Sequence, residues 1–316
     1  MNKAKIIVIL VCIQCILYGC DSTNESNEQR ESILHQLYPN VSVSKIAIVP
    51  NGNIIAVVEK GVMRSIDKGK SWQYCINDYP HGRIIFSNDG YVYIPTLSGM
   101  YSSSNYGSSW SFTDSIAKFT DGNLVLAKSL GSMVVTSNNY VFGTSSNGVL
   151  CSTNRGKNWF EPDTSFHISY IEDICQIHDT LFVSGIFGVL RSTNYGLSWD
   201  TLAAVDAWIA ELYTDSLNNI YVSNIFGSTY RSSDRGISWH NVYKGFLAGF
   251  TVGKNNVLFA VDRNLLKSSD NGLTWIEIVS ATDLGVTANS TAIDDEGYLY
   301  VGASMRGIYK SKTSFY

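Results

Sequence analysis

The chain has 316 residues, of which 45% are hydrophobic and 16% charged, and its formal net charge at pH 7 is −4. This acidic balance argues against nucleic acid as a partner, because a phosphate backbone requires a basic protein face. The length is compatible with one all-β domain that closes on itself, whereas an open β-sheet of that size would be unusual.

The first 19 residues predict an export signal. Two lysines precede a short apolar run at 6–17, which is typical of a signal peptide. The run is shorter than the roughly 20 apolar residues that a membrane-spanning helix needs. The segment 17–20 (LYGC) resembles the bacterial lipobox, in which Cys20 is acylated after cleavage behind Gly19. We therefore expect residues 1–19 to be a lipoprotein signal peptide; an ordinary secretory signal with an incidental cysteine is the alternative.

Residues 20–32 predict a lipidated cysteine followed by a flexible tether. The segment 21–32 (DSTNESNEQRES) contains no apolar residue and cannot form a core. Loss of the signal peptide removes two lysines and leaves 21 basic against 27 acidic side chains, a net charge of −6. We expect a protein held in the bacterial cell envelope by lipid on Cys20, on the periplasmic or cell-surface side.

An eight-residue pattern recurs along the rest of the chain, with the consensus Ser-x-Asp/Asn-x-Gly-x-Ser/Thr/Asn-Trp; we call each copy a box turn. Complete copies span 65–72, 103–110, 152–159, 192–199, 232–239 and 268–275. The oxygen at the third position can accept bonds from backbone N–H groups, and the glycine provides a positive φ, so each copy predicts a tight turn. The third position accepts Asp or Asn, which indicates a capping role rather than catalysis or metal binding. Its residues are Asp67, Asn105, Asn154, Asn194, Asp234 and Asp270.

Alternating apolar strands and short turns precede the box turns and predict four strands per repeat. Successive box serines are 36 to 49 residues apart, which is the period of a β-propeller blade rather than of a helical solenoid. A cut-off seventh copy begins at Ser311. We predict that residues 33–316 form an all-β fold: a single seven-bladed β-propeller of four-stranded antiparallel blades.

The last copy ends inside its turn, so the seventh blade lacks an outer strand, and its exposed edge must be covered. The segment 33–38 (ILHQLY) precedes the first blade. We predict that it pairs with Ile308–Ser311 and closes the ring. The longest interval between box turns places about ten extra residues near 118–130, which predicts a small hairpin or a long loop.

The box turns resemble the Asp-box (BNR) repeats of sialidases, sortilin-type receptors and photosystem II assembly factors, and the resemblance covers roughly residues 44–316. In those families the box lies between the third and fourth strands, at the blade periphery and away from the central pocket. The resemblance therefore implies that the six box residues are structural, and that function resides elsewhere.

Side chains outside the repeat pattern, in loops that would gather at one mouth of the channel, are the candidate ligand-binding residues. Trp208 is the only tryptophan outside a box turn. An exposed aromatic platform beside charged groups suits a sugar or a peptide, whereas plugging of the channel by Trp208 is the alternative. The other candidates are His81, Arg83, Phe187, Phe226, Asp262, Arg263 and Arg306. No spacing suggests a metal site or a cofactor.

Sialidase-like hydrolysis would need an arginine cluster, a Tyr–Glu nucleophile pair and an acid/base Asp. Arg83, Arg263 and Arg306 could supply the cluster, but no Tyr–Glu pair and no Arg-Ile-Pro motif accompany them. The sequence therefore favours a non-catalytic, membrane-anchored module that binds or assembles a protein or glycan. A sialidase-like glycoside hydrolase acting at the channel mouth is the alternative, and two carboxylates about 5–10 Å apart there would favour it.

Overall fold

The structure, a computed structural model, describes residues 33–316 apart from ten short gaps. These gaps are 79, 81, 97–98, 114–115, 121–122, 128–129, 146–147, 164–169, 203–207 and 285–286. The predicted signal peptide, the tether and Cys20 lie outside the described residues. Within the described part, no helix is long and apolar enough to cross a membrane.

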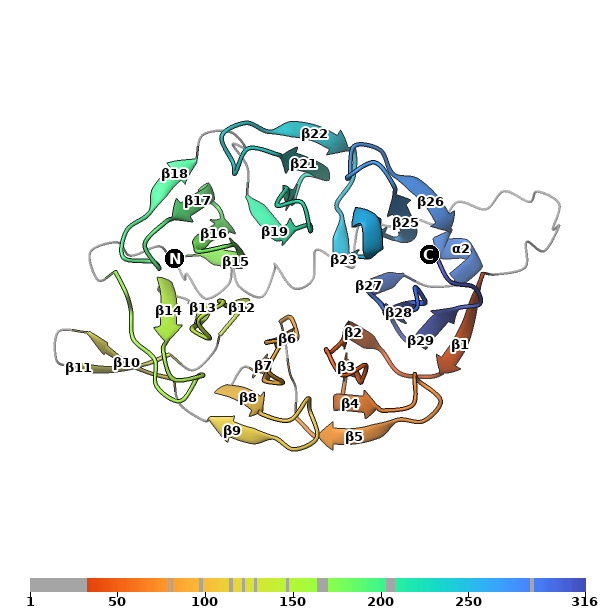
Figure 1. The fold of residues 1–316 in the computed structure, drawn as a ribbon, viewed down its shortest axis with the longest axis horizontal. Coiled ribbons are helices and arrows are strands. Elements are labelled where there is room, and N and C mark those ends of the chain that lie inside the picture. The colour runs from red at the N-terminus through yellow and green to blue at the C-terminus, as the bar shows by residue number, and fades with distance from the viewer. Residues whose placement is uncertain are drawn as a thin grey trace, which may run out of the picture. The chain divides into compact units, whose positions relative to one another are not determined.

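Seven sheets follow one another around a ring and form a seven-bladed, all-β propeller, as predicted (Figure 1). Blade 1 consists of β2 (Val43–Ile48), β3 (Ile54–Val58), β4 (Gly61–Ser65) and β5 (Gln73–Ile76). Blade 2 consists of β6 (Ile85–Phe86), β7 (Val92–Thr96), β8 (Gly99–Ser103) and β9 (Ser111–Thr113). Blade 3 consists of β12 (Met133–Val135), β13 (Val141–Ser145) and β14 (Gly148–Ser152).

The remaining blades repeat the same antiparallel order from inner to outer strand. Blade 4 consists of β15 (Ile171–Ile177), β16 (Thr180–Gly185), β17 (Gly188–Ser192) and β18 (Asp200–Leu202). Blade 5 consists of β19 (Ile209–Thr214), β20 (Ile220–Asn224), β21 (Ser228–Ser232) and β22 (His240–Tyr243). Blade 6 consists of β23 (Ala248–Val252), β24 (Leu258–Asp262), β25 (Asn264–Ser268) and β26 (Ile276–Val279). Short helical turns, η2 (Lys254–Asn256) and α2 (Ala281–Leu284), lie in connections.

Blade 7 closes the ring in the predicted way. It consists of β27 (Ala288–Ile293), β28 (Leu299–Ala303), β29 (Gly307–Ser311) and the N-terminal strand β1 (Leu34–Tyr38). Strand β1 pairs antiparallel with β29, with Leu34 opposite Ser311 and Tyr38 opposite Ile308. Leu34 is buried among core residues of blades 6 and 7. The first strand of the described chain therefore completes the last blade.

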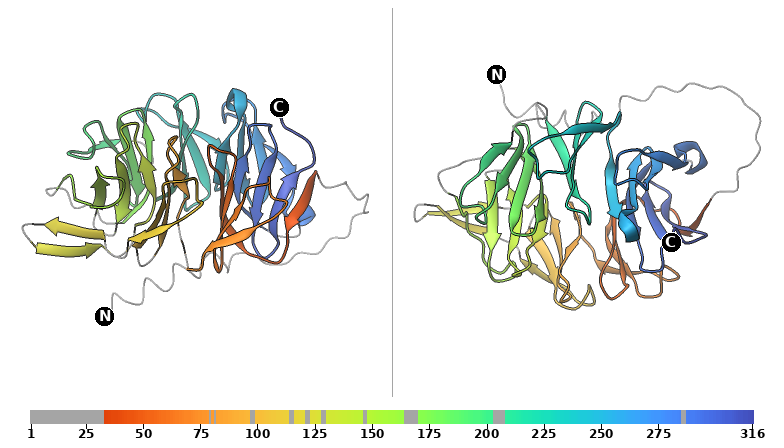
Figure 2. Two further views of the ribbon diagram at one scale, coloured as in Figure 1. Left: turned by 60° about the horizontal axis from the view of Figure 1, so that its bottom comes forward. Right: turned by 45° about the horizontal axis from the view of Figure 1, so that its top comes forward.

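Two features depart from the regular four-stranded plan. In blade 3 the outer strand is reduced to one bridge between Cys151 and Phe160, which follows the third box turn. Between blades 2 and 3, β10 (Ile116–Thr120) and β11 (Asn123–Ala127) form a separate two-stranded hairpin that projects from the ring (Figure 2). This hairpin is the predicted insertion, although its turn residues 121–122 lie outside the described part.

The hydrophobic core lies between neighbouring blades. Successive side chains of a strand point to opposite faces, so a strand that is buried on both faces must be apolar at every position. In β3, Ile54 and Ala56 pack with residues of blade 7 such as Tyr300. Ile55 and Val57 pack with residues of blade 2. This packing on both faces holds the blades in a fixed ring around the channel.

The box turns lie at the rim, between the third and the outer strand of their blades. In the first copy, Ser65 Oγ donates to Asp67 Oδ1 at 2.8 Å and accepts from the Gly69 N–H at 2.8 Å. Asp67 Oδ1 also accepts from the Ser71 N–H at 2.9 Å, and Trp72 Nε1 donates to the Gly69 carbonyl at 3.0 Å. The third-position oxygen is thus a cap, as the sequence pattern predicts.

The exchange of Asp for Asn at this position has a simple geometric basis. In the Asp67 copy the Ser71 hydroxyl donates to the second carboxylate oxygen at 2.5 Å. In the Asn105 copy the bond runs the other way, because the Asn105 amide donates to Ser109 Oγ at 2.9 Å. A hydroxyl can donate or accept, so either side chain completes the turn.

Candidate functional site

The inner strands bring charged side chains together at the centre of the ring. In blades 1, 4, 5 and 7 the inner strand contains a β-bulge, and the residue just after it is Lys45, Asp173, Glu211 or Ser290. A bulge adds one residue and re-aims the side chain that follows. Arg83 of blade 2 lies just before the inner strand β6. We call these five the hub residues.

Arg83 joins three blades across the channel. Its Nη2 atom lies 2.5 Å from Asp173 Oδ2 and 2.7 Å from Glu211 Oε2, and its Nη1 donates to the Leu212 carbonyl at 2.9 Å. The guanidinium also lies 4.1 Å from the ring centroid of Tyr213. The paired carboxylates raise the pKa of Arg83 despite its burial. This brace ties blade 2 to blades 4 and 5.

The two acidic partners of Arg83 are in different environments. Burial raises the pKa of Asp173, whose Oδ2 also accepts from the Leu212 N–H at 2.7 Å. Burial also opposes ionisation of Glu211, but nearby Lys45 and Arg83 outweigh it, so the pKa of Glu211 is lowered. Tyr213 donates its hydroxyl to Glu211 Oε2 at 2.7 Å. Every one of these contacts favours an ion-paired, ordered brace.

The brace brings two carboxylates close together but does not provide the chemistry of a hydrolase. Since Asp173 Oδ2 and Glu211 Oε2 lie 2.5 and 2.7 Å from the same nitrogen, they are at most 5.2 Å apart. The Asp173 side chain is only 4% exposed, however, and neither acid lines the cavity that occupies the central channel. Arg83 thus pairs with the two carboxylates that would otherwise serve as acid and nucleophile.

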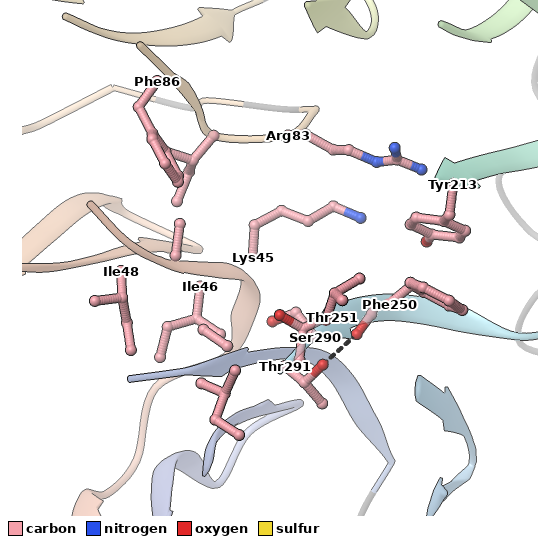
Figure 3. Close-up of a pocket in the computed structure, with 16 residues that line it drawn as sticks. Lys45, Ile46, Ile48, Arg83, Phe86, Tyr213, Phe250, Thr251, Ser290 and Thr291 are labelled. Carbon is pink, nitrogen blue, oxygen red and sulfur yellow. Dashed lines mark hydrogen bonds between the residues drawn. The ribbon is translucent and has the colours of Figure 1, made fainter. Parts of the chain in front are cut away.

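A cavity of about 310 Å³ occupies the channel beside the brace (Figure 3). Its wall includes the cationic side chains Lys45 and Arg83, the aromatic rings Phe86, Tyr213 and Phe250, and the hydroxyl residues Thr251, Ser290 and Thr291. Lys45 extends from blade 1 toward Tyr213 of blade 5 (Figure 3). Among the described residues that line the cavity, none has a carboxylate.

A second feature lies at the mouth of the channel, where blades 4 and 5 meet. The Trp208 indole N–H donates to Glu172 Oε1 at 3.0 Å, and the Trp208 carbonyl accepts from the Ile225 N–H at 3.2 Å. The turns at the ends of the neighbouring strands carry exposed apolar side chains: Tyr170 (64% exposed), Ile186 (49%), Ile225 (48%) and Phe226 (75%). We call these four residues and Trp208 the mouth strip. Trp208 is half-buried and does not line the central cavity, which argues against its being the plug of the channel.

The other candidates from the sequence are dispersed. Phe187 is half-buried and packs into the core between blades 3 and 4. Asp262 accepts a hydrogen bond from the Tyr243 hydroxyl at 2.9 Å. Arg263 and Arg306 are exposed on hairpin turns and do not line the cavity with Arg83, so the three arginines form no cluster. His81 lies outside the described residues.

Sequence reasoning missed Lys45, Asp173, Glu211 and Ser290. A positional signal was present, because Lys45, Arg83, Glu211 and Ser290 each stand three residues before the end of an inner strand. In the described part of the chain, no group of three or more His, Cys, Asp or Glu side chains could hold a metal ion.

The fold is that of a seven-bladed propeller, the class to which similar solved structures also belong. No family model matches the sequence, and no curated protein matches it. The structure titled YCF48 bound to D1 peptide is similar at a TM-score of 0.67 and 14% identity, with 92% of this chain and 100% of that chain covered.

Two further solved structures are also similar to this chain. The extracellular domain of BT4673 from B. thetaiotaomicron has a TM-score of 0.67 and 15% identity, covering 91% of this chain and 40% of that one. Virginiamycin B lyase from Staphylococcus aureus, crystallised with quinupristin, has a TM-score of 0.67 and 15% identity, covering 88% and 98%. At such identities the likeness establishes the fold alone, so function has to be argued from the site.

Proposed function

We propose that this protein is a non-catalytic binding module that captures a segment of a partner protein on the mouth strip. The observation that carries the proposal is the exposure of Phe226 and Ile225 beside the fixed indole of Trp208. Exposed apolar side chains that gather on a protein surface mark interaction sites, and aromatic residues contribute most of the binding energy there. The aliphatic Ile186 and Ile225 favour a protein over a glycan, since a sugar site needs hydrogen-bonding groups around its aromatic platform.

Two lines of support come from outside the strip. A structure with this fold has been solved with a bound peptide, and another belongs to an extracellular domain. The box turns resemble those of Asp-box families that include receptors and assembly factors. We further propose that Cys20 carries a lipid and holds the module in the bacterial envelope; the lipobox-like segment supports this.

The hydrolase alternative rests on one observation, the short separation of Asp173 and Glu211. Against it stand the ion pairs of both acids with Arg83 and the near-complete burial of Asp173. Release of the fluorophore from a fluorogenic sialoside by the purified protein would favour the hydrolase and contradict the non-catalytic proposal.

The binding proposal is tested with the immobilised chain from Asp21 onward. Proteins of an envelope extract are captured, identified by mass spectrometry and quantified for wild type, Trp208→Ala and Phe226→Ala. The matched control is Leu197→Ala, which truncates an equally exposed apolar side chain (61%) on a box turn at the rim. Loss of a hot-spot residue costs about 2 kcal/mol or more and so weakens binding by more than about tenfold.

We expect at least one captured protein to be lost with both mouth-strip variants and retained with Leu197→Ala. Equal capture by all four proteins would show that the mouth strip is not the binding surface. A glycan array on the same variants separates the ligand classes: glycan binding that depends on Trp208, with no variant-dependent protein, would replace the protein proposal.

A further inference from the structure

The charges at the hub are not equally compensated. Arg83 is satisfied by Asp173, Glu211 and the Leu212 carbonyl. Lys45, by contrast, has no carboxylate within ion-pair distance among the described residues, although it is the charge that contributes most to the lowered pKa of Glu211. A half-buried ammonium without a close partner keeps its attraction for an anion, because it is only partly screened by solvent.

Of these charged side chains, only the cationic ones line the cavity. Lys45 and Arg83 line it, whereas Asp173 and Glu211 do not. The four side chains together are formally neutral, but a group inside the cavity lies closer to the two cations than to the two carboxylates. A carboxylate or phosphate there would be stabilised by Lys45, whose compact ammonium accepts either geometry.

Ser290 provides an independent indication of a ligand. Its side chain is 3% exposed, it lines the same cavity, and its hydroxyl has no hydrogen-bond partner. Buried hydroxyls are nearly always bonded, so an unpartnered one needs an explanation. The adjacent Thr291 differs, because its hydroxyl donates to the Gly249 carbonyl. The Ser290 hydroxyl is shielded from solvent, so the side chain has to rotate toward the cavity before it can donate to a bound oxygen.

Cavity size and wall chemistry limit the ligand. A volume of about 310 Å³ is at the lower end of the range for small-molecule sites. Phe86 and Phe250 add apolar surface on which the carbon skeleton of a ligand can pack. The wall thus fits a compact metabolite that carries one anionic group, of the size of a sugar acid or a sugar phosphate.

We propose that the central cavity binds a small oxyanion, namely a carboxylate or phosphate group on a compact metabolite. Lys45 is the charge partner of this group, and Ser290 is a hydroxyl donor to it. The site is separate from the mouth strip and goes beyond the proposed function. Its occupation does not require a protein partner.

The test is isothermal titration calorimetry, in which the full chain is titrated with glucuronate, glucose 6-phosphate, inorganic phosphate and glucose. The first three probes present a carboxylate, a phosphate ester and a free phosphate, and glucose is the neutral control. We expect one anionic sugar to bind at least about tenfold more tightly than glucose, with an affinity that falls as salt is added. A preference for glucuronate assigns a carboxylate site, and a preference for glucose 6-phosphate assigns a phosphate site.

Variants connect the binding to the hub. Lys45→Met should weaken the preferred probe by about tenfold or more, and Lys45→Arg should restore part of that loss. Ser290→Ala should weaken it less, and it provides a second readout if Lys45→Met fails to fold. The matched control is Lys60→Met, on the exposed β3–β4 turn. Anionic probes that bind no better than glucose, or unchanged binding by Lys45→Met and Ser290→Ala, would overturn the proposal.

Discussion

Arg83 before β6 reaches Asp173 on β15, with Nη2 and Oδ2 2.5 Å apart, and thereby connects blades 2 and 4 across the central channel. The contact stabilises the ring only while both charges are present, since the Asp173 side chain is 4% exposed. Removal of one partner leaves the other buried and unpaired.

We predict that Arg83→Met lowers the free energy of unfolding by about 3–5 kcal/mol, the range for breaking a buried ion pair. Urea denaturation measures the change. The control is the double variant Arg83→Met with Asp173→Asn, which removes the stranded charge and should recover part of the loss. A single variant as stable as wild type would show that the brace does not hold the blades.

Ring closure gives a second prediction, at Gly307. Its φ is +86°, and a Cβ there would lie 1.7 Å from the Tyr38 carbonyl oxygen of the closing strand. Gly227 has a similar φ of +78°, but nothing lies within 4 Å of its Cβ position. At either position alanine is strained by the positive φ, which costs about 1 kcal/mol, but only Gly307→Ala also displaces β1.

We therefore expect Gly307→Ala to lower the thermal unfolding midpoint clearly more than Gly227→Ala. Hydrogen exchange locates the effect: the amides of β1 and β29 should lose protection in Gly307→Ala alone. Equal shifts of the two midpoints would mean that strain, and not the contact with Tyr38, dominates.

The rim and the closure could be predicted because their signals are local. A box turn is contained in eight residues, and the closing strand pairs with the strand that leads into the box copy at Ser311. The hub has no local signal. Arg83, Asp173 and Glu211 belong to different blades, and they meet only because the ring closes and because bulges in β15 and β19 re-aim the two acids.

The sequence pattern points to only some residues of the mouth strip. Trp208 was identified because no box turn explains it, and Phe226 because it lies in a turn. No sequence feature indicates that Ile186 and Ile225 are exposed, since an aliphatic residue in a strand-rich sequence usually belongs to the core. Their exposure depends on where each hairpin turn begins, and the sequence pattern does not fix this boundary.

The box turns give a pH prediction. Hydrogen bonds from Ser71 and Ser65 lower the pKa of Asp67 from 3.8 to about 2, and bonds from Ser238 do the same for Asp234. The folded state therefore binds these protons less readily than the unfolded state. The resulting stabilisation is complete above about pH 4 and is lost as the pH falls through about 2.

The variant Asp67→Asn/Asp234→Asn/Asp270→Asn should consequently lose less stability than wild type between pH 4 and pH 2. Asparagine already fills this position in three copies, so the turns should persist. Thermal midpoints measured across this range test the claim, with Asp295→Asn on an exposed turn as the control. Parallel curves for wild type and the triple variant would exclude the box carboxylates as the source of acid sensitivity.

The closing strand itself can be tested through a single side chain. Leu34 is 4% exposed and packs among Phe259, Leu265 and Val301, whereas its neighbour Ile33 is 37% exposed. Leu34→Ala should lower the free energy of unfolding by about 2–5 kcal/mol, because the wall between blades 6 and 7 would retain a cavity. Ile33→Ala should change it by about 0.5 kcal/mol or less. Urea denaturation measures both changes. Equal effects of the two variants would mean that closure of the ring does not depend on the packing of β1.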